Sequence, residues 1–172
     1  VPFLDHHVAH YAARVPIAVA SGAQTKEIDD VLGRAGLRGH FLAVVGADHV
    51  RCWRFQAEGG SWSLPFAELE RLISPRTRLL VVNFPHNPTG FLPSPALQRR
   101  IVDLVEQAGI WLFSDEMYHG LVHSGTPPIP SAADLSTRAV VLAGLSKSYG
   151  LPGLRCGWLL ARDPALRERL MN

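Results

Sequence analysis

Short apolar runs alternate along this chain with segments in which apolar residues recur every three or four positions. This alternation predicts an α/β fold with a mostly parallel sheet and flanking helices. Strands are expected at residues 16–20, 41–45, 51–55, 79–83, 110–114, 139–144 and 155–161. Helices are expected at residues 25–35, 65–73 and 94–107, and Asp163 and Pro164 are typical of the start of a last helix.

Composition fits an ordinary globular protein of one domain or slightly more, since 47% of the 172 residues are hydrophobic and 19% are charged. The net charge is only +2 and the arginines are scattered, which argues against a nucleic-acid partner. No apolar run is long enough for a membrane helix. The sequence starts at Val1 without Met, has no signal-peptide pattern and contains two cysteines. We therefore expect a soluble, cytoplasmic fragment or processed chain.

Three polar segments each follow an apolar run. They are Asn-Phe-Pro-His-Asn-Pro-Thr-Gly at 83–90, Ser-Asp-Glu-Met-Tyr at 114–118, and a segment at 145–158 that begins Leu-Ser-Lys-Ser-Tyr-Gly. Taken singly, they are a generic turn, a helix cap and a solvated lysine. The carboxyl ends of parallel strands share one edge of a sheet, however, so these segments can converge on one ligand.

In this order the three segments resemble the fold-type I aminotransferases of class I and II. The resemblance runs from about residue 51 to residue 172 and implies a partial large domain. It also implies pyridoxal 5'-phosphate as cofactor, and transfer of an amino group between an amino acid and a 2-oxo acid. This cofactor acts as an electron sink and needs a lysine, an acid at its ring nitrogen and groups that bind its phosphate.

The resemblance gives four residues a role at the cofactor ring. Lys147 forms the imine with the cofactor and later moves the substrate proton, for which a lysine amine of adjustable pKa is suited. Asp115 pairs with the protonated ring nitrogen. Tyr118 and Asn87 hydrogen-bond the phenolic oxygen of the ring, which lowers the pKa of the imine.

By the same resemblance, Arg155 binds the cofactor phosphate through two parallel hydrogen bonds. Many relatives carry a phosphate-binding Ser or Thr three residues before the lysine, where this chain has Gly144. Ser146 is a further candidate phosphate ligand. Relatives continue into a small domain that binds the substrate carboxylate, and they form homodimers, so a truncated or fused form and a homodimer are both expected. The sequence does not identify the amino-acid substrate.

The first fifty residues fit this family less well. Ser21 to Gln24 can be read as the family's upstream phosphate-binding turn, but no tyrosine follows before Arg51. Residues 16–50 resemble the middle of haloacid-dehalogenase-like phosphatases more closely, with Ser21 as the phosphate-binding hydroxyl. That family's nucleophilic aspartate motif is missing. We therefore predict a junction near Val50 between unrelated pieces, with a diverged aminotransferase N-terminus as the alternative.

Histidines raise the question of a metal site. His6, His7 and His10 are close in sequence, and His119 and His123 are four residues apart. A catalytic zinc site needs three ligands and an open position, so spacing alone does not support one, and no metal is expected. Two functional alternatives to the aminotransferase are kept: a non-catalytic cofactor-binding remnant and a phosphate-monoester hydrolase.

Overall fold

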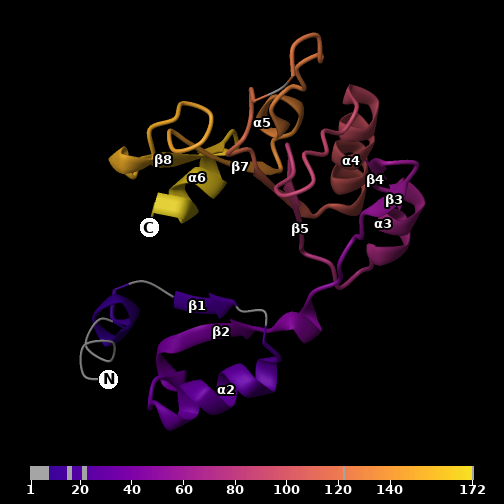
Figure 1. The fold of residues 1–172 in the computed structure, drawn as a ribbon. Coiled ribbons are helices and arrows are strands. Elements are labelled where there is room, and N and C mark those ends of the chain that lie inside the picture. The colour runs from indigo at the N-terminus through magenta and orange to yellow at the C-terminus, as the bar shows by residue number, and fades with distance from the viewer. Residues whose placement is uncertain (1–7, 15–16, 21–22, 122, 172) are drawn as a thin grey trace. The chain divides into compact units, whose positions relative to one another are not determined.

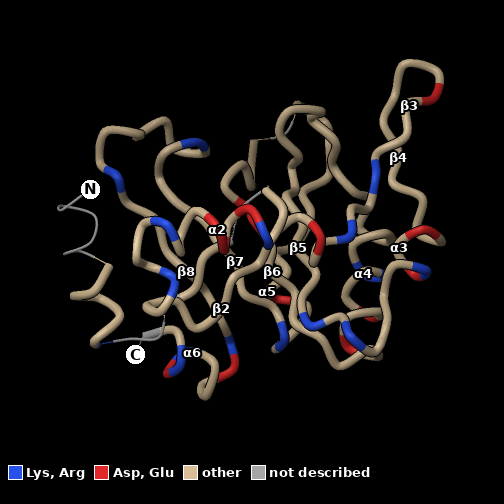
Figure 2. Tube along the Cα trace, turned by 90° about the horizontal axis from the view of Figure 1, so that it is seen from below, with Lys and Arg blue, Asp and Glu red and all other residues tan. Residues whose placement is uncertain are grey.

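The computed structural model describes residues 8–14, 17–20, 23–121 and 123–171. The chain forms two compact units, Val1–Cys52 and Trp53–Asn172 (Figure 1). The junction predicted near Val50 falls close to the boundary between them. Along both units, Lys and Arg are interspersed with Asp and Glu (Figure 2), as the scattered arginines of the sequence indicate. Among the described residues, no helix is both long and apolar enough to cross a membrane.

The N-terminal unit is built on a parallel pair of strands, β1 (Ile17–Ala20) and β2 (Phe41–Val45), connected through helix α2 (Thr25–Arg34). Asp48 holds the first turn of α2, because its Oδ1 accepts hydrogen bonds from both the backbone N–H and the hydroxyl of Thr25, each at 2.7 Å. These bonds to Thr25 lower the pKa of Asp48. The predicted strand and helix at 41–45 and 25–35 are therefore present, while Pro16 and Ser21 lie outside the described residues.

The C-terminal unit contains a four-stranded sheet in the order β5-β6-β7-β8. Strands β5 (Leu79–Asn83), β6 (Trp111–Asp115) and β7 (Ala139–Gly144) are parallel, and β8 (Gly157–Ala161) runs antiparallel to β7. The helices are α3 (Phe66–Leu72), α4 (Pro95–Ala108), α5 (Ala132–Leu135) and α6 (Pro164–Met171). The predicted α/β class with a mostly parallel sheet is confirmed.

Helix α4 covers one face of this sheet. The helix starts where the Ser94 hydroxyl accepts the N–H of Leu97 at 3.1 Å, and it ends at Gly109, whose φ of 65° is left-handed. Its apolar side and the inner faces of β5 and β6 form the core, which includes Leu80, Val82, Ile101, Val102, Val105 and Leu112. Alternate positions of β5 on the opposite face, Leu79 and Val81, are exposed.

The strand predicted at 51–55 is wrong. The described residues 51–55 form no strand, and the first strands of the C-terminal unit are the hairpin β3 (Gln56–Glu58) and β4 (Ser61–Ser63). Trp53 and Phe55 instead pack against the core, and the indole of Trp53 donates to the Pro65 carbonyl at 2.9 Å. The strand predicted at 155–161 starts only at Gly157, because Arg155 has a left-handed φ of 46°.

Candidate active site

The candidate site lies at the carboxyl edge of the four-stranded sheet. Strands β5 and β6 end in register, with Asn83 opposite Asp115. The Asp115 carbonyl accepts the N–H of Phe84 at 3.1 Å and the side-chain amide of Asn83 at 3.4 Å. These bonds continue the ladder for one step beyond the strands, so the polar segments that follow both strands start side by side.

A pocket of about 410 Å³ opens at this edge. It is lined by Asn83, His86, Asn87, Asp115, Met117, Tyr118 and Lys147. Four of the six residues selected from the sequence therefore line one pocket: Asn87, Asp115, Tyr118 and Lys147. They come from three segments that are far apart along the chain.

Hydrogen bonds within the pocket orient these side chains. The Asn87 amide Nδ2 donates to the phenol oxygen of Tyr118 at 3.1 Å, and the backbone N–H of Asn87 donates to Asn83 Oδ1 at 2.9 Å. One carboxylate oxygen of Asp115 accepts the N–H of Met117 at 3.0 Å. The Lys147 ammonium nitrogen lies 5.8 Å from the centre of the Tyr118 ring. An amine, a carboxylate, a phenol and an amide are thus presented to one space.

Ser146 and Arg155, the two residues selected for phosphate binding, do not line this pocket. The Ser146 hydroxyl donates to the sulfur of Met117 at 3.4 Å. The Arg155 side chain is exposed, and its Nη1 donates to the Pro152 carbonyl at 3.4 Å. Both hydrogen bonds are weak, because the one from Arg155 is long and the one from Ser146 has a sulfur as acceptor.

Gly144 occupies a crowded position at the end of β7, opposite Gly157 of β8. A Cβ atom at residue 144 would lie 3.0 Å from the Cys156 carbonyl oxygen, 3.1 Å from Gly157 Cα and 3.3 Å from Met117 Cε. These distances are tighter than ordinary van der Waals contacts. The close approach of β8 therefore accounts physically for glycine at the position where the family resemblance led us to expect a phosphate-binding Ser or Thr.

Glu116 was not selected from the sequence, yet it is nearly fully buried beside Asp115. Its Oε1 accepts the Ser114 hydroxyl at 3.0 Å and the N–H of Ala132 at 2.8 Å, and its Oε2 lies 3.6 Å from His119 Nδ1. This carboxylate ties the end of β6 to the first turn of α5. An acid directly after a buried strand was the available signal.

His86 was also missed, although it directly precedes Asn87 and lines the pocket. Its Nδ1 lies 2.8 Å from the Thr89 hydroxyl, and its ring centroid lies 4.2 Å from that of Phe55. Burial lowers the pKa of His86 below its ordinary value of 6.5. Burial therefore favours the neutral form of the ring, in which one nitrogen donates and the other accepts.

No group of three or more His, Cys, Asp or Glu side chains that could hold a metal ion occurs within residues 8–14, 17–20, 23–121 and 123–171. His119 instead lies beside Glu116. His6 and His7 lie outside the described residues.

Comparison with known proteins identifies a family whose members this chain resembles in sequence. The model of the family "Aminotransferase class I and II" matches residues 41–172. Capreomycidine synthase of Streptomyces vinaceus is 37% identical over 127 residues, covering 74% of this chain and 32% of the relative. Valine–pyruvate aminotransferase of Mycobacterium tuberculosis is 41% identical over 108 residues, covering 63% and 27%. The chain thus spans about a third of the length of these relatives.

Solved structures of similar fold match a larger share of this chain than the two sequence relatives do. A PLP-dependent aminotransferase from Streptococcus suis superposes with a TM-score of 0.59 and 26% identity, over 85% of this chain and 35% of that one. Cystalysin from Treponema denticola, described as containing a pyridoxal 5'-phosphate cofactor, gives a TM-score of 0.63 at 18% identity, over 90% and 37%. The match to cystalysin is a likeness of fold.

Proposed function

Because the chain belongs to the class I and II aminotransferase family, we propose that it binds pyridoxal 5'-phosphate and transfers an amino group between an amino acid and a 2-oxo acid. The observation that carries this proposal is the convergence of Asp115, Tyr118 and Lys147 on one pocket. When bound, the cofactor supplies an electron sink for the carbanion that forms at the amino-acid carbon.

The donor set fits this cofactor. Lys147 is the amine of the pocket, and its Nζ would hold the cofactor at its aldehyde carbon and would move a proton at the substrate carbon. One Asp115 oxygen accepts the Met117 N–H, so the carboxylate has acceptor positions for a protonated ring nitrogen. Asn87 donates to the Tyr118 oxygen, which lets the phenol O–H donate to an oxyanion in the pocket.

Phosphate binding by Arg155 and Ser146 is part of the same proposal. Arg155 would exchange a 3.4 Å bond to the Pro152 carbonyl for phosphate oxygens, and Ser146 would exchange a thioether sulfur. Both exchanges favour the phosphate, because sulfur is a weak acceptor and guanidinium binds phosphate with two charge-assisted bonds. With Gly144 in place of a hydroxyl residue, these two side chains carry this role.

A second pocket, of about 450 Å³, shares His86, Asn87 and Tyr118 with the first. We assign the substrate side chain to this adjoining space, whose apolar wall includes Leu92 and Leu121. Small molecules are the expected partners, without nucleic acid or membrane. We propose that the protein is cytoplasmic and forms a homodimer. Light scattering of the purified protein tests the homodimer.

The second candidate is a cofactor-binding remnant without transamination, and the observation that favours it is that Ser146 and Arg155, the candidate phosphate ligands, do not line the pocket. The two candidates are separated by mixing the protein with pyridoxal 5'-phosphate, recording the absorption band of the bound cofactor, and adding amino acids. An enzyme converts the cofactor to pyridoxamine 5'-phosphate. A band that persists with every amino acid supports the remnant, and the absence of any Lys147-dependent band contradicts both.

The origin of residues 1–50 stays a prediction. The family model extends back to residue 41, which favours the diverged aminotransferase alternative over the phosphatase resemblance for residues 41–50. The phosphatase alternative is tested with an aryl phosphate and Mg²⁺, and it requires that turnover is lost in Ser21→Ala. Sequencing the gene on both sides of this frame tests the junction: a longer aminotransferase frame that reads continuously through Val50 would contradict it.

A further inference from the structure

Ser148, the residue after Lys147, is hydrogen-bonded to the segment that carries Tyr118. Its hydroxyl oxygen lies 2.7 Å from the His119 carbonyl oxygen and 3.0 Å from the Met117 carbonyl oxygen. A serine hydroxyl has one proton to donate, so the two carbonyls share this donor. Because they lie on either side of Tyr118, the neighbour of the lysine is attached to both neighbours of the tyrosine.

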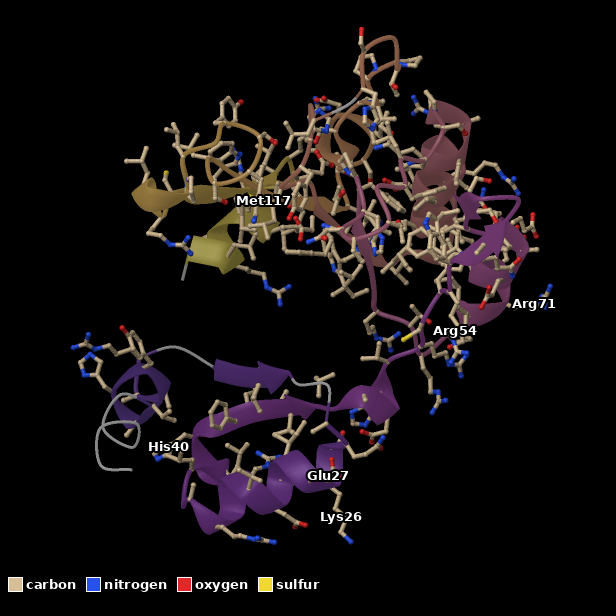
Figure 3. The ribbon with its side chains drawn as sticks, in the orientation of Figure 1. Lys26, Glu27, His40, Arg54, Arg71 and Met117 are labelled. Atoms are coloured by element: carbon tan, nitrogen blue, oxygen red, sulfur yellow. The ribbon has the colours of Figure 1, made fainter. Side chains whose placement is uncertain are left out.

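Another hydrogen bond between the same two segments is weaker. The Ser146 hydroxyl donates to the Met117 sulfur, which is a weak acceptor, at 3.4 Å. Met117, labelled in Figure 3, directly follows the Asp115–Glu116 pair at the end of β6, and its N–H donates to Asp115. A shift of Ser148 therefore changes the position of Lys147 relative to both Tyr118 and Asp115.

The segment that Ser148 contacts is itself hydrogen-bonded to the sheet. The His119 N–H donates to the Glu116 carbonyl at 2.8 Å, and the Glu116 N–H donates to the Leu142 carbonyl of β7 at 2.8 Å. The Lys147 side chain is exposed, by contrast, and no hydrogen bond of its ammonium group is found among the described residues. An exposed lysine side chain samples many rotamers, so the position of its backbone determines how often the amine faces the pocket.

We propose that Ser148 is a positioning residue for Lys147. Its hydroxyl anchors the lysine-bearing loop to the Met117–His119 turn and so sets the 5.8 Å distance between Lys147 Nζ and the Tyr118 ring. The Ser148 hydroxyl donates to these two backbone carbonyls, so its role in this proposal is exerted through the position of Lys147. This inference rests on the proposed function, since it concerns the reach of the cofactor-binding amine.

The test measures how fast Lys147 captures the cofactor, independently of turnover. The full 172-residue protein is mixed with subsaturating pyridoxal 5'-phosphate, samples are reduced with borohydride at successive times, and the labelled lysine is quantified by peptide mass spectrometry. Lys26 is the one other lysine in the sequence and lies on α2, so it reports nonspecific labelling within the same molecule (Figure 3).

Four variants are compared with the unaltered protein. Ser148→Ala is expected to label Lys147 about 3- to 10-fold more slowly, the range of one lost hydrogen bond. Ser148→Thr keeps the hydroxyl and is expected to retain the rate, whereas Ser148→Cys keeps the size with a weak donor and is expected to be slow. Ser61→Ala is the matched control, because the Ser61 hydroxyl also donates to a carbonyl, that of Glu58 at 2.9 Å. It is expected to change nothing.

The inference is overturned if Ser148→Ala captures the cofactor at the unaltered rate, or if Ser148→Thr is as slow as Ser148→Ala. Where Ser148→Ala does not fold, as judged by its thermal unfolding, Ser148→Cys decides: the unaltered rate overturns the inference and a reduced rate supports it. If Lys147 of the unaltered protein is labelled no faster than Lys26, the proposed function itself fails and this inference fails with it.

Discussion

The side-chain amide of Asn87 donates a 3.1 Å hydrogen bond to the phenol oxygen of Tyr118, which joins two segments 31 residues apart. Asn87 follows strand β5 and Tyr118 follows strand β6. Because the Tyr118 oxygen accepts this bond, its own O–H remains available to donate to another group. The two residues that we expect, from the family resemblance, to bind one oxygen of the cofactor are thus in direct contact.

Tyr118→Phe tests the role of this phenol. A hydrogen bond to an anionic oxygen stabilises the deprotonated form, so its loss is expected to raise the pH midpoint of the bound cofactor's absorption change by roughly 1 to 2 units. Tyr149→Phe, a change at an exposed tyrosine of the lysine loop, is the matched control. An unchanged midpoint in Tyr118→Phe would show that the phenol does not contact the cofactor.

Gly144→Ala is expected to lower the free energy of unfolding by about 1 to 3 kcal/mol, because the added Cβ meets the Cys156 carbonyl oxygen at 3.0 Å and Gly157 Cα at 3.1 Å. Gly153→Ala is the control, since nothing lies within 4 Å of a Cβ there. Chemical denaturation measures both. Equal stability of the two variants would refute the crowding that accounts for the missing hydroxyl residue.

Glu116→Ala is expected to cost about 1 to 3 kcal/mol of folding stability, because the buried N–H of Ala132 and the Ser114 hydroxyl lose their acceptor. Glu70→Ala removes an exposed carboxylate and serves as the control. The same denaturation curves decide the comparison. A loss no larger than that of Glu70→Ala would mean that Glu116 does not hold the end of β6 to α5.

His86 is expected to titrate below 6.5, because burial disfavours its charged form. As the pH falls below 6.5, the unfolded chain takes up this proton before the folded chain does, so protonation of His86 reduces folding stability. NMR titration of the imidazole carbons measures the pKa. Phe55→Ala, which removes the ring 4.2 Å away, is expected to raise it. A midpoint at or above 6.5 in the unaltered protein contradicts the burial.

The regular elements were largely predictable because local patterns determine them. The apolar run of β7 and the Ser94 and Pro95 start of α4 were visible in the sequence and are present as predicted. The strand at 51–55 was wrong because Trp53 and Phe55 alternate with polar residues for packing and not for strand pairing. The adjacent hairpin was missed although Gly59 and Gly60, both with positive φ, are a recognised two-residue turn signal.

The candidate site was predictable to the extent that it consists of residues in ordered motifs. Lys147, Asp115, Tyr118 and Asn87 were selected in this way and line one pocket. The supporting residues were not predictable. Glu116 bonds to Ala132, 16 residues later, and Ser148 bonds to residues 29 and 31 positions earlier. Such contacts depend on how β6 and β7 pair, which no single segment specifies.

The central claim, that Lys147 binds pyridoxal 5'-phosphate in this chain, is tested most directly by borohydride reduction of the protein–cofactor mixture and mass spectrometry of the product. We predict one reduced-cofactor adduct, located on Lys147, and none there after Lys147→Arg. Lys26 provides the internal comparison, because the sequence contains no third lysine. An adduct divided evenly between Lys26 and Lys147, or no adduct at Lys147, would contradict the account.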